Sequence, residues 1–397
     1  MQRRQVHFLF LNIGHFLDHL MLLIFATAAA LRLSQEWGMS YAELIPYATP
    51  GFVAFGLCAI PAGWLADKWS REGMMAVFFI GIGFSAIGCA FAQSAWQIAV
   101  GLTLVGIFAA IYHPVGLALV VHGRTRTGVP LAVNGIFGNM GVACAALLTG
   151  FIIDVSGWRL AFLLPGCAAI IVGLGYLYFL RCGVGNPADD ALPTGHKSEP
   201  EKIERRVLIR IFAIILFTTA VGGLIFQSTT FALPKVFTER LQDIAGTATL
   251  IGWYSFLVFS LAAFAQLAVG YLVDHYSVRF VFAGVAALQA VFFYTMVQLS
   301  GTPALIISIL FMLVVFGQIP INDVLVGRIV RSEWRARAYA LRYIVTFSVM
   351  ASAVPMIAWL HANRGFDALF VVLAVAASCI FFAVLLLPST RGVVVRS

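Results

Sequence analysis

Charged residues are scarce in this chain of 397 residues, because only 11% are Asp, Glu, Lys or Arg and 61% are hydrophobic. A water-soluble protein carries about 25% charged residues. This composition cannot build a surface that faces water on all sides, so it predicts a protein whose main solvent is lipid. The net charge of +8 then indicates membrane topology rather than nucleic-acid binding, because Lys and Arg collect in cytoplasmic loops.

Motifs of soluble chemistry are also missing. The sequence has no G-x-x-x-x-G-K-[ST] phosphate loop, no H-E-x-x-H, no C-x-x-C and no G-x-S-x-G. The first absence argues against a pump that hydrolyses ATP by itself, and the others leave no signature of a soluble enzyme. The six cysteines mostly lie inside apolar runs without the spacing of a metal site. We therefore expect neither an enzyme nor a cofactor.

Long apolar runs dominate the chain. A helix needs about 20 mostly apolar residues to cross a bilayer, and twelve runs reach roughly that length. They cover residues 6–31, 43–66, 73–93, 96–121, 129–153, 158–180, 208–233, 247–272, 279–299, 303–327, 336–360 and 366–388. Continuous runs favour helices over a barrel, whose strands alternate apolar and polar residues. The predicted fold class is an all-α membrane protein with twelve transmembrane helices.

One motif occurs twice, 207 residues apart. Residues 63–70 read Gly-Trp-Leu-Ala-Asp-Lys-Trp-Ser, and residues 270–277 read Gly-Tyr-Leu-Val-Asp-His-Tyr-Ser. Almost the same offset places residues 157–162 near residues 364–370. Internal repeats of this size are typical of secondary transporters. We expect two six-helix halves, and their predicted boundaries are residues 1–180 and 207–397 with a polar cytoplasmic linker at 181–206.

The distribution of basic residues predicts the orientation. If the N-terminus is cytoplasmic, 20 of the 25 Lys and Arg residues fall in cytoplasmic segments or at their helix ends. The opposite orientation reverses this ratio, so both termini are expected in the cytoplasm. The long first run lacks the features of a cleavable signal peptide and is interpreted as the first span.

Ionisable residues inside the first span need an explanation. A charged group at the centre of a membrane helix costs ~2.5–3.5 kcal/mol even on insertion scales. His15 and His19 lie one turn apart on one helix face, and Asp18 lies near mid-depth. A carboxylate beside imidazoles can hold or release a proton, so Asp18, with His15 and His19, is the predicted proton-coupling group, and His113 of the fourth span is a further expected partner or substrate contact. A structural polar contact to a neighbouring helix is the alternative. A metal site is not expected, because no third clear ligand lies nearby in the sequence.

The two halves and the loop motif Gly63-x-x-x-Asp67-x-x-x-Arg71 resemble the major facilitator superfamily over the whole chain. The resemblance implies alternating access, with a cytoplasmic gate at this loop and at its second copy. Anchoring of the loop without a role in cycling is the alternative. The expected gating residues are Gly63, Asp67, Arg71, Gly270, Asp274, Arg279 and Arg342.

The same resemblance implies that the first, fourth, seventh and tenth spans line a central cavity. Proline occurs near the same depth in the fourth span (Pro114) and the tenth (Pro320), each time with polar neighbours. Proline frees a backbone carbonyl and bends a helix, which favours a cavity at that depth. The expected cavity residues are Tyr112, His113, Asn139, Gln227, Gln318, Asn322 and Asp323. Close helix packing is the alternative for the asparagines of the fifth span, and a static salt bridge to Arg342 is the alternative for Asp323.

Three short stretches resemble the fosmidomycin-resistance type of exporter within that superfamily. They are His15-x-x-Asp18, Tyr112-His113-Pro114 and the glycine- and asparagine-rich residues 134–141. This resemblance implies proton-driven efflux of a drug or metabolite across a bacterial inner membrane, by a monomer with no nucleic-acid partner. Two features often found in proton antiporters are missing, a Gly-Pro element in the fifth span and an arginine early in the fourth. Uptake of a small organic anion or nutrient by proton symport, and a non-transporting membrane receptor, stay open as alternatives.

Overall fold

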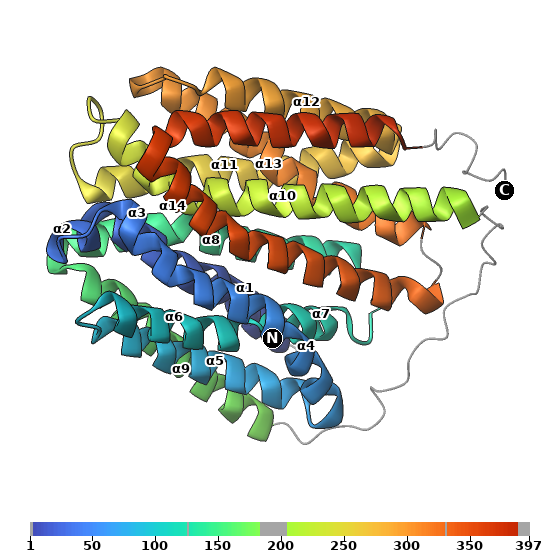
Figure 1. The fold of residues 1–397 in the computed structure, drawn as a ribbon. Coiled ribbons are helices and arrows are strands. Elements are labelled where there is room, and N and C mark those ends of the chain that lie inside the picture. The colour runs from blue at the N-terminus through green and yellow to red at the C-terminus, as the bar shows by residue number, and fades with distance from the viewer. Residues whose placement is uncertain (1–2, 125–126, 183–204, 330–331, 388–397) are drawn as a thin grey trace. The chain divides into compact units, whose positions relative to one another are not determined.

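The computed structural model describes residues 3–124, 127–182, 205–329 and 332–387, almost all of them helical (Figure 1). Within these ranges, the side chains at positions 205, 208, 323, 327–329, 332–341, 343 and 344 are not described. Most of the predicted linker lies outside the described residues. The predicted boundaries of the two halves therefore stay a prediction.

The chain divides into two compact units. The first unit contains Met1–Ser198 and Thr247–Phe256, and the second contains Glu199–Gly246 and Leu257–Ser397. The helices of the first are α1 (Arg3–Ala28), η1 (Ala29–Leu33), α2 (Ser34–Glu36), α3 (Tyr41–Leu44), η2 (Ile45–Ala48), α4 (Thr49–Lys68), α5 (Arg71–Ala90), α6 (Ala95–Ala109), η3 (Tyr112–Gly116), α7 (Leu117–Val121), α8 (Gly128–Ser156) and α9 (Trp158–Arg181). The second contains α10 (Arg205–Arg240), most of α11 (Ala248–His275), α12 (Val278–Thr295), α13 (Gly301–Ile329) and α14 (Ser332–Leu385).

Eleven helical stretches of the described residues are long and apolar enough to cross a membrane. The last of them belongs to α14, in which Gly365 adopts a φ of +70°, outside the helical region. Two helices therefore meet at Gly365, where the sequence predicts a break between the spans 336–360 and 366–388. The prediction of an all-α protein with twelve transmembrane helices is confirmed.

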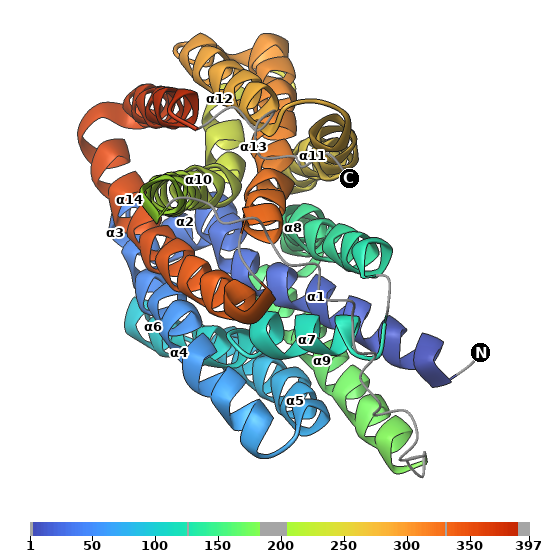
Figure 2. The same ribbon diagram turned by 90° about the vertical axis from the view of Figure 1, so that its right-hand side faces the viewer.

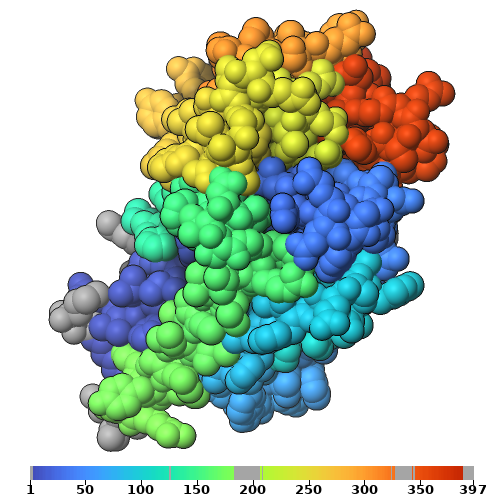
Figure 3. All heavy atoms as spheres, turned by 90° about the vertical axis from the view of Figure 1, so that its left-hand side faces the viewer, coloured from blue at the N-terminus to red at the C-terminus, as the bar shows by residue number. Residues whose placement is uncertain are grey.

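Glycines set the closest helix contacts of the first unit. A Cβ atom added at Gly141 of α8 would lie 2.2 Å from the backbone oxygen of Phe16 on α1. Gly83 of α5 and Gly166 of α9 face each other's backbone in the same way. Figure 2 shows α5 and α9 side by side, and Figure 3 shows the green residues of α9 between α1 and the blue to cyan residues of α5 and α6. Such small residues let membrane helices approach backbone to backbone.

The fourth span is interrupted at its proline. Helix α6 ends at Ala109, and the π-helical turn η3 contains Pro114 before α7 continues the span. Proline has no N–H for the helical ladder, and π-helical turns often occur at functional sites. In the second unit, Pro320 lies inside the continuous helix α13. The interruption in η3 is what places His113 toward α1.

Each unit ties three helix ends together with one ion pair. In the first unit, Arg159 at the start of α9 pairs with Glu36 of α2 at 2.9 Å and donates to the carbonyl of Ala92, just after α5. The second unit uses Arg240 at the end of α10, which pairs with Asp367 and donates to the carbonyl of Leu299, a few residues after α12. The repeated halves therefore hold equivalent helix ends together, but the acid and the base have exchanged places.

Candidate functional site

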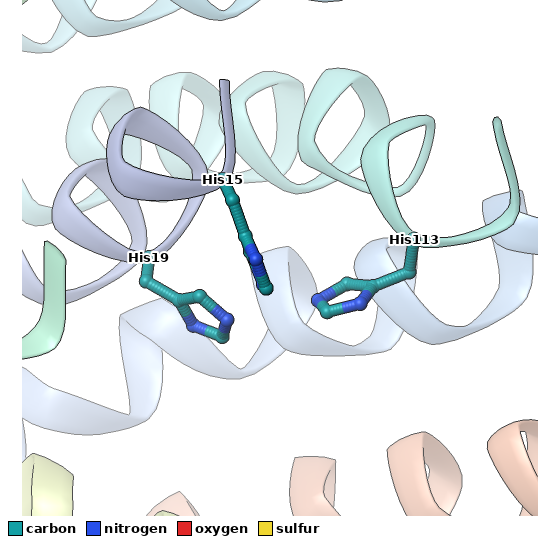
Figure 4. A group of neighbouring side chains, drawn as sticks. All are labelled: His15, His19 and His113. Carbon is teal, nitrogen blue, oxygen red and sulfur yellow. The ribbon is translucent and has the colours of Figure 1, made fainter. Parts of the chain in front are cut away.

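The residues predicted for coupling lie together in the first unit. His15, Asp18 and His19 project from α1, and His113 projects from η3. The ring centroids of His15 and His19 are 5.0 Å apart. The ring centroid of His113 lies 5.4 Å from that of His15 and 5.5 Å from that of His19. Figure 4 shows the three imidazoles pointing toward one another. The fold therefore brings His113, an expected partner of Asp18, beside the pair of imidazoles that the helical spacing places on one face.

Asp18 is the buried charge of this group. Its side chain is 0% exposed, and its Oδ2 lies 3.5 Å from Nε2 of His113. Among the described residues, neither carboxylate oxygen accepts a well-formed hydrogen bond. A carboxylate buried with so little compensation is costly unless a cation or a proton accompanies it. This position therefore favours a site that binds a positively charged species.

His15 is fixed by a backbone carbonyl. Its Nδ1 lies 2.8 Å from the carbonyl oxygen of Asn134 on α8. Because a carbonyl only accepts, Nδ1 must carry the proton, and Nε2 of the neutral ring keeps its lone pair. The ring of Tyr112 stacks on the imidazole, with centroids 4.7 Å apart. The tautomer and the orientation of His15 are therefore both set by its surroundings.

A buried hydrogen-bond network holds Asn134 in place. The Tyr112 hydroxyl donates to the carbonyl of Leu11 at 2.8 Å and accepts from Nδ2 of Asn134 at 2.9 Å. The same amide donates to Oδ1 of Asn12 at 3.0 Å. The cavity residues predicted from the sequence include Asn139 of the same helix but not Asn134. The position of Asn134 in a glycine-rich part of the fifth span is the sequence signal that could have assigned it to the site.

Gly138 makes room for the His15 ring. A Cβ atom at this position would lie 2.6 Å from Nε2 of His15, which is closer than such atoms approach. Gly135, one turn earlier on α8, has nothing within 4 Å of its virtual Cβ. The two glycines of the same helix therefore differ in function, and only Gly138 is required by the site.

The second unit holds a neutral polar network. Nε2 of Gln289 donates to Oε1 of Gln318 at 2.7 Å, and Gln318 donates to the carbonyl of Thr218 at 3.4 Å. The Thr218 hydroxyl donates to Oδ1 of Asn322 at 3.1 Å. Gln318 and Asn322 were predicted for the cavity, whereas Gln289 and Thr218 were missed because single amides and hydroxyls carry little sequence signal.

The remaining residues predicted for the cavity, and Arg342 predicted for the gate, lie on different helices. Asn139 and Gln227 are buried in α8 and α10. Arg342 is also buried, with 7% of its surface exposed, in α14. The side chain of Asp323 lies outside those described, so its pairing with Arg342 stays a prediction.

The loop motif forms an ion pair of its own. Nη2 of Arg71 lies 2.8 Å from Oδ1 of Asp67, and the two side chains are 41% and 66% exposed. Gly63 lies against the ring of Pro114, whose Cβ is 3.4 Å from the glycine's virtual Cβ. This contact joins the loop helix α4 to the turn that carries His113.

The second copy of the motif lies in the second unit. Asp274 is exposed near the end of α11, where Gly270 has open space around it, and Arg279 is half-buried at the start of α12. A cluster of Asp67, Arg71 and Asp274 in one conformation stays a prediction.

Comparison with known proteins gives a family and a set of relatives. The sequence profile of the Major Facilitator Superfamily matches residues 11–243. A probable 4-methylmuconolactone transporter of Cupriavidus pinatubonensis is 24% identical over 380 residues, covering 92% of this chain and 86% of that protein. A gallate transporter of Pseudomonas putida is 28% identical over 136 residues. That match covers 34% of this chain and 30% of the relative, so this chain spans less than a third of it.

Solved structures agree on the fold. The crystal structure of a peptide transporter, POT, superimposes with a TM-score of 0.76 at 15% identity, covering 95% of this chain and 93% of that one. An identity this low supports the architecture alone.

Proposed function

The chain belongs to the Major Facilitator Superfamily, and on that premise we propose that it takes up a small carboxylic acid by alternating access, driven by the proton gradient. The observation that carries the proposal is the group formed by the buried Asp18 and His15 with the half-buried His19 and His113 inside a membrane-spanning region. Ionisable residues at this depth are costly and mark substrate or ion pathways. A receptor or scaffold on the same fold would not require them.

The relatives favour a carboxylic acid as the substrate. Gallate and 4-methylmuconolactone, which the two relatives are named for, are both small ring compounds with a carboxyl group. Aromatic and imidazole faces in the first unit suit a ring, and an imidazole N–H can donate to a carboxylate oxygen. The proposed substrate class is therefore a small ring-bearing carboxylate.

Uptake replaces export as the favoured direction. Efflux is what the resemblance to fosmidomycin-resistance exporters implies. That resemblance rests on residues 134–141 and two shorter stretches. Neither sequence relative described above is named as an exporter, and the relatives therefore support the alternative of proton-symport uptake. An acid that is ionised outside the cell can be accumulated only with a driving force. Symport with protons supplies this force from the proton gradient.

The membrane arrangement completes the proposal. The chain is a multi-pass membrane protein, and we place it in the bacterial inner membrane as a monomer. Both termini are cytoplasmic in this proposal, because that orientation puts most Lys and Arg residues inside.

Proteoliposomes test the proposed function. The purified protein is reconstituted, a gradient with acid outside is imposed, and uptake of radiolabelled gallate, benzoate and 4-methylmuconolactone is measured against protein-free vesicles. We expect at least one acid to accumulate above its outside concentration and to leak out when a protonophore is added. Accumulation that needs the opposite gradient would establish export instead, and no movement of any carboxylate would remove the proposed substrate class.

A further inference from the structure

The imidazoles of His15, His19 and His113 form a cluster that carboxylate transport does not by itself require. Each ring offers one nitrogen, and these three atoms all lie within 4.8 Å of one another. A metal site was not expected from the sequence, because no third ligand lay near His15 and His19, but the fold brings His113 to them. We propose that this cluster binds a divalent late transition-metal ion, such as Zn²⁺ or Co²⁺, through three imidazole ligands.

The separation of the nitrogens suits such an ion after small rotations. A tetrahedral zinc ion lies 2.0–2.1 Å from each imidazole nitrogen, which requires nitrogens about 3.4 Å apart. The rings of His19 and His113 are half-buried, so they are accessible and can turn about their side-chain bonds. His15 is buried and fixed. Two adjustable ligands beside one rigid ligand can close around an ion without movement of the backbone.

The surroundings of His15 are those of a metal ligand. Its Nδ1 donates to the carbonyl of Asn134, which leaves the lone pair of Nε2 for coordination. Metal-binding histidines almost always donate their second ring N–H to a carbonyl, a carboxylate or water, and this bond sets the tautomer. Asn134 is itself held by Tyr112 and Asn12. The hydrogen bonds that orient His15 as a ligand are therefore already formed by the protein alone.

Asp18 supplies the charge that such a site needs. Three neutral imidazoles would leave a divalent ion with two positive charges in a membrane-spanning region. The carboxylate of Asp18, 0% exposed and 3.5 Å from Nε2 of His113, offsets one of them. The same carboxylate lies beside Nε2 of His113, in the position from which an outer-shell carboxylate accepts the second ring N–H of a zinc-binding histidine.

The ligand set selects the class of metal. Imidazole nitrogen favours zinc, copper, nickel and cobalt, whereas magnesium and calcium prefer oxygen ligands. Three protein ligands leave a fourth position open to water or to a carboxylate, as in sites with exchangeable ligands. The proposal concerns binding by the protein alone and does not rest on the transport activity proposed above.

Cobalt binding to the purified full-length protein tests the site. A Strep tag replaces any polyhistidine tag, which would itself bind metal, and Co²⁺ is titrated in detergent while visible absorption is recorded. Tetrahedral Co²⁺ absorbs far more strongly than octahedral Co²⁺, so we expect intense bands that saturate at one ion per chain. Zn²⁺ should bleach them, whereas Mg²⁺ should leave them unchanged.

Variants assign the ligands. His113→Gln and His19→Gln should each lose the intense bands and weaken Co²⁺ binding at least about 10-fold, and His275→Gln, at an exposed position outside the cluster, should match the parent. Asp18→Asn keeps all three ligands, so it should retain the bands while affinity falls about 10- to 100-fold. Size-exclusion profiles and helical circular dichroism confirm folding. Weak octahedral-type spectra in the parent, or an unchanged titration in a folded His113→Gln variant, would overturn the proposal.

Discussion

Asp18 and His113 lie 95 residues apart in the sequence, yet the carboxylate of one is 3.5 Å from the imidazole of the other. The contact joins the first span to the interrupted turn of the fourth. It brings the only carboxylate predicted near mid-depth into a group of three imidazoles.

Replacing Asp18 by Asn tests the coupling role predicted from the sequence. The variant keeps the shape of the side chain and removes its charge. With one proton per substrate, a gradient of one pH unit sustains about tenfold accumulation, and we expect the variant to show none. Counterflow exchange of labelled for unlabelled substrate should survive, because exchange requires no net proton movement.

The comparison uses the same proteoliposomes for both measurements. If Asp18→Asn vesicles still concentrate substrate with the pH dependence of the parent, coupling belongs to another residue. Asp323 would then be the next carboxylate to replace.

Replacing Gly138 by Ala tests the fit of His15. The new methyl group would lie 2.6 Å from Nε2 of His15, so the ring must leave its place on Asn134. We expect the initial rate of uptake to fall about 10-fold or more, since a misplacement near 1 Å can cost this much in an active site. Gly135→Ala is the matched control, because it has nothing within 4 Å and alanine favours helix. Equal uptake by both variants would show that His15 needs no fixed position.

Replacing Asp67 by Asn tests the loop motif. The change removes the ion pair with Arg71, at 2.8 Å, while both side chains remain largely in solvent. Because the exposed pair contributes at most about 1 kcal/mol to stability, membrane insertion should be unchanged. A gating role predicts that turnover falls roughly 5-fold or more, as for other coupled conformational steps. Asp243→Asn, in the exposed turn after α10, serves as control, and parental turnover in Asp67→Asn would leave the motif as a loop anchor.

Exchanging the charges of Glu36 and Arg159 tests the ion pair of the first unit. Either single reversal places like charges together and should lower the unfolding midpoint in detergent, by an amount equivalent to about 1 kcal/mol or less for this partly exposed pair. The double variant Glu36→Arg with Arg159→Glu restores opposite charges in the order that the second unit uses. Recovery should be incomplete, because Trp158 also donates to Glu36 at 2.9 Å. A double variant less stable than both singles would contradict the equivalence of the two units.

The sequence was sufficient for the fold because lipid imposes a simple rule. Twelve apolar runs had to be helices, and even the break at Gly365 was visible as a gap between two runs. The site was predicted only in part. Helical spacing placed His15 and His19 on one face and His113 was an expected partner of Asp18, but no local pattern could show that the three imidazoles would form one cluster.

Two further features lay beyond sequence reasoning for different reasons. The anchor of His15 is the backbone carbonyl of Asn134, and a carbonyl has no sequence signature. The opposite ion pairs were hidden because their acids and bases fall at slightly shifted positions in the repeat. Glu36 and Arg240, for example, are 204 residues apart rather than 207.

The exchanged ion pairs bear on how the two units diverged. If both descend from one ancestral unit, at least one pair has reversed both of its charges, and single substitutions must pass through a stage with like or missing charges. Such a stage is tolerable only where water can solvate an unpaired charge. Glu36 and Arg159 are 30% and 47% exposed, so neither charge of the first pair would have been shut away from solvent, whereas in the second pair Asp367 is 41% exposed and Arg240 only 14%. The buried residues around Asp18 could not pass through a stage with an unpaired charge in the same way. Accordingly, the first unit has a carboxylate predicted near mid-depth, and no counterpart is predicted at that depth in the second unit.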